Sequence, residues 1–95
     1  MGRLVVGSCQ LRLVIPASAS LKDKRRVVKS LCQRVHRRFN VSVAEVDTLA
    51  AATVATLGIC CVANRRQHAR DVLEAVVRWV QGQSEGDVVV FDWEV

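Results

Sequence analysis

The feature that most constrains the fold is a change of hydrophobic period along the chain. Apolar residues alternate with polar ones over residues 4–15, whereas they recur at helical spacing over residues 21–38, and both patterns return further on. A period of two is typical of a strand with one buried face, and a period near 3.6 of an amphipathic helix. At 95 residues the chain has room for one domain, so we expect a single α+β unit over residues 1–95.

The first strand is predicted over Leu4–Ile15. Pro16 ends it, and Ala17–Ala19 is expected to be a short connector. The face that we expect to be buried is formed by Val5, Gly7, Cys9, Leu11, Leu13 and Ile15.

The first helix is predicted over Leu21–Arg38. Ser20 is a suitable N-cap, and Asp23 follows three residues later, close to the capping-box spacing. Asn40 is expected to end the helix in the left-handed conformation. The apolar stripe is formed by Leu21, Val28, Leu31, Val35 and Phe39.

Two further strands are predicted over Val41–Asp47 and Val54–Ala63, because both runs are rich in β-branched residues. The intervening alanines favour a helix by propensity, but the segment is too short to hold one alone, so we expect a loop. Gly58 lies within the second run and indicates a bulge or a close backbone approach.

The second helix is expected to begin after Asn64 as N-cap, with Gln67 completing a capping box. Glu74 and Arg78 are spaced for a stabilising pair one turn apart. The apolar stripe is formed by Ala69, Val72, Leu73, Val76 and Val80.

A turn over Gly82–Gly86 and a strand over Asp87–Val95 complete the order β-α-β-β-α-β. We expect Val89, Phe91 and Trp93 on one face of that strand, with Asp92 and Glu94 on the other. Right-handed crossovers then predict a ferredoxin-like plait, a four-stranded antiparallel sheet with two helices on one face. The predicted core includes Leu11, Leu13, Leu31, Val35, Ile59, Leu73 and Val76.

The net charge of +5 is concentrated in the first helix. Residues 21–38 hold eight basic residues and one acid, for a net charge of +7, whereas the rest of the chain carries −2. One arc opposite the apolar stripe holds Lys22, Arg25, Arg26, Lys29 and Arg37. Such an arc is consistent with a solvated surface, but like charges one turn apart repel, so a one-sign stripe also indicates an anionic partner.

RNA is the favoured anionic partner. The predicted third strand lacks the aromatic residues with which sheet-face RNA-binding domains stack bases, and no Gly-x-x-Gly loop occurs. Contacts from the helix to phosphates are expected instead, and these position a protein without reading sequence, which suits structured RNA. A membrane partner is disfavoured, because the apolar stripe is needed for the core.

No residue pattern indicates an enzyme, a cofactor, a metal site or a small-molecule substrate. The four cysteines lack the spacing of a disulfide framework, and the absence of an export signal together with free thiols favours a cytoplasmic location. Cys32 and His36 are one turn apart and could touch, but nothing supplies an oxyanion hole. We therefore expect no catalytic residue, no metal ligand and no cofactor-binding residue.

Several blocks of the sequence resemble the YlxP-like family of small bacterial proteins of unknown function. They are Ser20–Arg25, Val28–Leu31, Phe39–Val46, Leu57–Gly58 and Asn64–Leu73. The resemblance implies a ferredoxin-like fold and association with RNA or ribosomes, with no catalytic residue to carry over. The chain departs from the family at Leu49–Thr53, where relatives have a polar loop with a basic and aromatic end.

Two functional hypotheses follow. The first is a non-catalytic RNA- or ribosome-associated protein that uses its basic helix, and the second is a structural module that forms a homodimer. The two are compatible. An apolar patch on the sheet face away from the helices supports the second. It is expected to include Leu4, Val6, Val14, Val62, Val88 and Val90.

Overall fold

The computed structural model describes residues 3–16 and 19–95 and has the six elements in the predicted order. Part of the expected connector, residues 17 and 18, lies outside the described residues. The elements are β1 (Val5–Val14), α1 (Leu21–Arg38), β2 (Ser42–Val46), β3 (Val54–Ala63), α2 (Arg66–Gln83) and β4 (Val88–Glu94).

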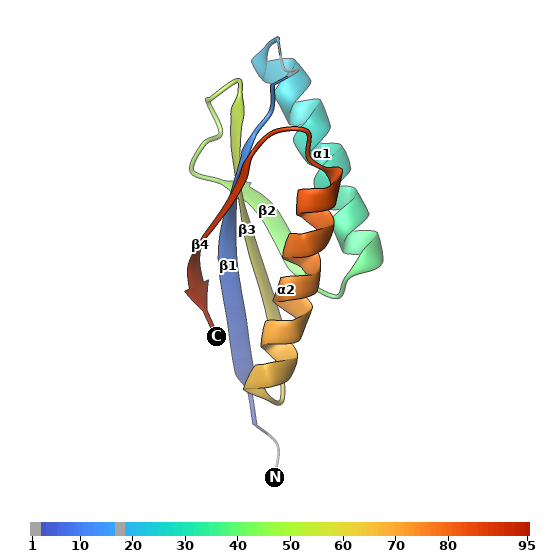
Figure 1. The fold of residues 1–95 in the computed structure, drawn as a ribbon, viewed down its shortest axis with the longest axis vertical. Helices are drawn as coiled ribbons and strands as arrows, with labels where there is room; N and C mark the ends of the chain where they lie inside the picture. The colour runs from blue at the N-terminus through green and yellow to red at the C-terminus, as the bar shows by residue number, and fades with distance from the viewer. Residues whose placement is uncertain (1–2, 17–18) are drawn as a thin grey trace.

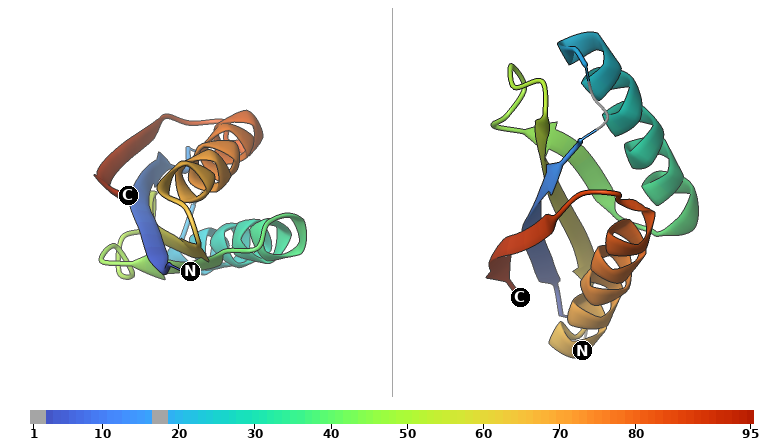
Figure 2. Two further views of the ribbon diagram at one scale, coloured as in Figure 1. Left: turned by 90° about the horizontal axis from the view of Figure 1, so that it is seen from below. Right: turned by 45° about the horizontal axis from the view of Figure 1, so that its top comes forward.

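The four strands form one antiparallel sheet in the order β2-β3-β1-β4, and both helices lie on one side of it (Figure 1). Viewed along the sheet, the helices diverge from each other (Figure 2). The fold is a ferredoxin-like plait, as predicted.

The core lies between the sheet and the two helices. All seven residues that the sequence places there are buried, and so are Cys9 and Cys61, whereas Cys60 points to the other face and is exposed. The alternation of β1 and the stripes of the helices therefore identified the buried faces correctly. The remaining core residues are Val28, Val43, Ala55, Leu57, Ala69, Val77 and Val80.

The N-terminal cap of α1 is the predicted one, whereas its C-terminal cap is not. Ser20 caps the N-terminus as predicted, and its hydroxyl accepts a hydrogen bond from the backbone N–H of Asp23 at 3.1 Å. The prediction of a left-handed Asn40 is wrong, because Phe39 is the C-cap, in an extended conformation. The Phe39 ring packs edge-on against Trp79, with ring centroids 6.2 Å apart. Its extended backbone leads the chain from α1 toward β2.

The start of α2 also differs from the prediction. Its N-cap is Arg65, which makes no side-chain capping bond, so the expected box of Asn64 and Gln67 is wrong. Gln67 instead donates its amide to the carboxylate of Asp71 at 2.8 Å, an acceptor one turn along the helix. The expected ion pair of Glu74 and Arg78 is not formed within the described residues.

The sheet has its irregularity in β4 rather than in β3. Pairing runs without interruption through Gly58, and a Cβ atom placed there would meet only methyl groups of Val46, at ordinary contact distance, so both the bulge and the close backbone approach were wrongly predicted. The register of β1 with β4 instead shifts between Ser8 and Gln10, and Asp92 has a φ of 50°, in the left-handed region.

This bulge changes which side chains of β4 are buried. Val88 and Val90 pack against the core, and Trp93 returns to the core only beyond Asp92. Val89 lies opposite Arg12, and Phe91 opposite Gln10, on the side away from the helices, which we call the open face. The expectation that Val89, Phe91 and Trp93 share a face is therefore wrong.

Candidate nucleic-acid interface

The solvent side of α1 is a stripe of basic side chains. Its five residues, called the basic stripe, are all exposed, and none has an acidic partner within ion-pair distance among the described residues. The stripe runs about 22 Å along the helix, at roughly 1.5 Å per residue. Its members are those predicted from the sequence: Lys22, Arg25, Arg26, Lys29 and Arg37.

Lys24 does not belong to this surface. Its side chain is fully buried, and its Nζ donates to the carboxylate of Glu45 at 2.6 Å and to the carbonyl of Thr48 at 2.8 Å. A longer bond reaches the carbonyl of Val54 at 3.4 Å. One of the eight basic charges of the helix is thereby neutralised internally, where it fastens α1 to β2 and to the loop that precedes β3.

Arg34 and Arg38 extend the basic surface toward α2. Their guanidinium carbons lie 5.6 and 5.7 Å from the centre of the Trp79 ring, which suits cation–π contact. Arg34 also donates to the side-chain oxygen of Gln83 at 3.1 Å. Both arginines contribute to the predicted charge of the helix, but neither was predicted to lie in the stripe. Their spacing of four residues was the available signal.

A second candidate surface is a shallow concavity of about 810 Å³ on the open face. Its lining combines apolar and polar side chains with three carboxylates, those of Asp47, Asp92 and Glu94. The side-chain amide of Gln10 on β1 donates to the carboxylate of Asp92 on the edge strand β4 at 2.9 Å. The surface is therefore less suited to an anion than α1 is.

The concavity also separates the apolar residues expected on the open face. Leu4, Val6 and Val62 are exposed at one end of the sheet, whereas Val14 is exposed at the other. Val88 and Val90 were wrongly assigned to this face, because the side chains of both pack against the core. Among the described residues, the apolar side chains of the open face therefore do not form the continuous patch that was predicted.

Burial favours the neutral thiol at three of the cysteines, Cys9, Cys32 and Cys61. Burial raises the pKa of Cys9 to about 11, and it also raises the pKa of Cys32 and of Cys61 above the ordinary value. A protonated thiol is a poor nucleophile. His36 is exposed on α1 and makes no hydrogen bond to Cys32 in the part of the chain that is described. Nor do any three His, Cys, Asp or Glu side chains of that part gather as metal ligands.

Comparison with known proteins gives a family and a fold. Residues 6–93 match the family described as "Protein of unknown function (DUF503)". The uncharacterized protein YlxP of Bacillus subtilis (strain 168) is 28% identical over 81 residues, which cover 85% of this chain and 88% of that protein.

A solved structure has a similar fold. It is a C-terminal segment of the alpha subunit of aIF2 from Pyrococcus abyssi, with a TM-score of 0.55 and 15% sequence identity. The match covers 94% of this chain, which spans about half of that segment (50%), and at this identity it shows the fold alone. Among the residues that the structure describes, no helix is both long and apolar enough to span a membrane.

Proposed function

The chain belongs to the DUF503 family of proteins of unknown function, and we propose that it is a non-catalytic cytoplasmic protein that binds structured RNA, such as that of a ribosomal subunit, through the basic stripe of α1. The observation that carries the proposal is the exposure of five cations on one helix face without acidic partners among the described residues.

The energetics of the free protein favour this use of the helix. Lys22 and Arg26 are like charges one turn apart, and so are Arg25 and Lys29. Each such pair destabilises an isolated helix by about 0.2–0.5 kcal/mol. Binding to a polyanion would turn this repulsion into attraction and release the counterions of the phosphates.

The expected contacts are to phosphates rather than to bases. The two aromatic rings beside α1, Phe39 and Trp79, pack against each other, and two guanidinium groups lie over Trp79. The helix therefore offers cations rather than a free stacking platform, so binding should follow the shape of a folded RNA and depend weakly on its sequence.

Salt dependence of RNA binding tests the proposal. If the five residues of the basic stripe each neutralise one phosphate, the slope of log affinity against log salt is expected near −4, at about 0.7–0.9 per contact. The probe is a folded fragment of ribosomal RNA, with binding followed by fluorescence anisotropy at several salt concentrations.

The double variant Arg26→Gln/Lys29→Gln should reduce the magnitude of that slope by nearly 2. Its matched control is Arg65→Gln/Arg66→Gln, which removes the same charge from exposed positions at the start of α2. An unchanged slope in the first variant, or an equal loss in both, would show that α1 is not the binding surface.

A further inference from the structure

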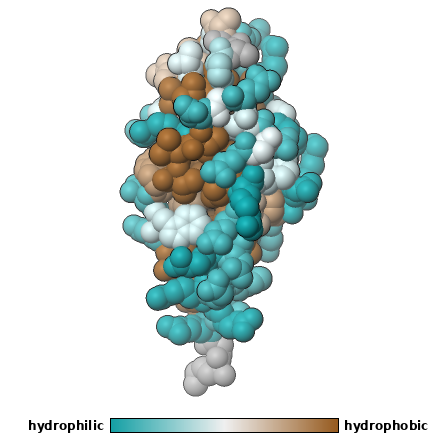
Figure 3. All heavy atoms as spheres, viewed as in Figure 1, coloured by the Kyte–Doolittle hydropathy of each residue, from teal (hydrophilic) through white to brown (hydrophobic). Residues whose placement is uncertain are grey.

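The edge strand β4 has an unusual surface for an edge. In the sheet as described, β4 pairs with β1 alone, and its segment Val88–Phe91 contains no charge and no proline. Val89 is 57% exposed, and apolar side chains gather over this strand on the molecular surface (Figure 3). Natural edge strands are usually protected by lysine, proline or a cover, because their unpaired N–H and C=O groups can pair with another chain.

The usable part of this edge has defined limits. The carbonyl of Asp87 accepts a hydrogen bond from the N–H of Val14 at 3.0 Å, so the extended segment begins one residue before β4. At the other end, Asp92 with its φ of 50° breaks the regular strand. The regular segment is therefore Asp87–Phe91, with Val89 at its centre.

A second copy of the same segment is complementary to it. In an antiparallel pair centred on Val89, Val88 lies opposite Val90 of the second copy on the core side, and each core is extended by aliphatic contacts. On the open side, Phe91 lies opposite Asp87 of the second copy. A pair centred on Val90 would instead set Val88 against the left-handed Asp92, which cannot continue the ladder.

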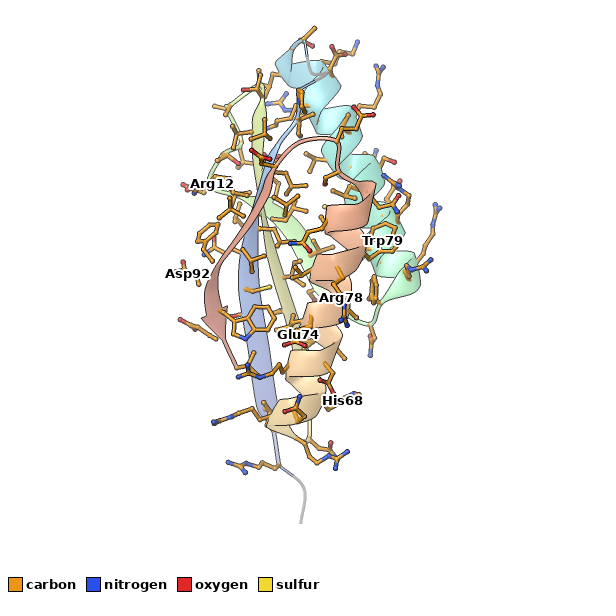
Figure 4. All side chains as sticks on the ribbon, in the orientation of Figure 1. Arg12, His68, Glu74, Arg78, Trp79 and Asp92 are labelled. Atoms are coloured by element: carbon orange, nitrogen blue, oxygen red, sulfur yellow. The ribbon has the colours of Figure 1, made fainter. Side chains whose placement is uncertain are left out.

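Charge complementarity supports the same register. The Arg12 guanidinium lies over the Phe91 ring, 4.9 Å from its centre, on the open face (Figure 4). Asp87 of the second copy would reach the neighbouring position on that face, so its carboxylate comes within range of this cation. The two-fold axis repeats the pair, which gives two such ion pairs for each dimer.

We propose that two copies of this chain associate through β4, as an antiparallel pair centred on Val89, to form one continuous eight-stranded sheet. Both α1 helices then lie on the same side of that sheet. The proposal concerns an edge that the basic stripe does not use, and it stands whether or not α1 binds RNA.

Sedimentation velocity of the purified protein without RNA measures the association directly. The full chain is expected to change from monomer to dimer as its concentration rises, and Val89→Lys should weaken the dimer at least about tenfold, because it places two cations on the axis. The matched control is Val62→Lys, a valine that is 68% exposed on β3 and away from the edge. A monomer at all concentrations, or equal weakening by both variants, would overturn the proposal.

Cross-linking tests the register. Val89 faces its own counterpart, with Cα atoms about 4.5–5.5 Å apart, a separation that a disulfide spans. In a Cys60→Ser background, Val89→Cys should therefore form a covalent dimer on mild oxidation, whereas Val62→Cys should not. A Val89→Cys protein that dimerises without cross-linking would refute the register. An Asp87→Asn variant that dimerises as tightly as the parent protein at low salt would refute the ion pair between Asp87 and Arg12.

Discussion

Replacing Lys24 by methionine is predicted to destabilise the fold more than any other single charge removal on α1. The variant keeps the length of the side chain but leaves Glu45, whose side chain is 9% exposed, without its cation, and removes a donor from the carbonyl of Thr48. Removing one partner of a buried ion pair costs about 3–5 kcal/mol, which is a large part of the roughly 5–15 kcal/mol that holds a domain of this size together.

The size of the effect is measured by urea unfolding, followed by circular dichroism. At about 4–8 °C per kcal/mol for a domain of this length, the melting temperature should also fall by roughly 20 °C. Lys22→Met is the matched control, because Lys22 is an exposed member of the basic stripe. Loss of its charge should change the free energy of unfolding by no more than about 0.5 kcal/mol.

A double variant separates the charge from the packing. Lys24→Met/Glu45→Leu removes both ions, so it should recover most of the lost stability, as replacement of buried ion pairs by apolar residues often does. The coupling free energy from this cycle is expected to exceed about 1 kcal/mol. If Lys24→Met costs no more stability than Lys22→Met, Lys24 and Glu45 do not form a buried ion pair in solution.

Two further predictions concern single buried groups. The hydroxyl of Thr56 is buried without a hydrogen-bond partner among the described residues. Thr56→Val should therefore leave the free energy of unfolding unchanged or raise it by up to about 0.5–1.5 kcal/mol. A loss of that size in a urea titration would show that the hydroxyl is hydrogen-bonded. Burial raises the pKa of the Cys9 thiol to about 11, against 9.0 for an ordinary cysteine. The unfolded chain therefore releases the Cys9 proton at a lower pH than the folded protein does, so the free energy of unfolding should fall as the pH rises from 9 toward 11. A Cys9→Ala variant should show a shallower fall over that range, and an equal fall in both proteins would rule out Cys9 as the cause.

The parts of the fold that depend on local pattern could be predicted from the sequence. The limits of α1 follow from Ser20 and the period of its apolar residues, and both are visible within one segment. The burial of Lys24 depends on Glu45, which is 21 residues away, and nothing near Lys24 distinguishes it from its exposed neighbours. The bulge at Asp92 has no glycine to mark it, so the alternation of β4 was followed one residue too far.

The basic stripe was predictable for the same reason, since the angular position of a residue on a helix follows from its number alone. The stacking of Arg34 and Arg38 on Trp79 was not, because it depends on how the second helix lies against the first. Pairwise contacts between distant segments therefore account for most of what the sequence analysis missed.

The place of β1 between β3 and β4 has a consequence for how the chain folds. The strand nearest the N-terminus is held on both sides by strands that come at least 40 residues later, with Val14 paired to Val54 and Leu13 to Val88. Contacts of such sequence separation must close long loops before they are rewarded, so folding is expected in milliseconds to seconds, slower than in a helical bundle of equal size. Until β4 docks, the backbone of β1 has an unpaired edge, which makes this the stage at which the nascent chain is most exposed to aggregation.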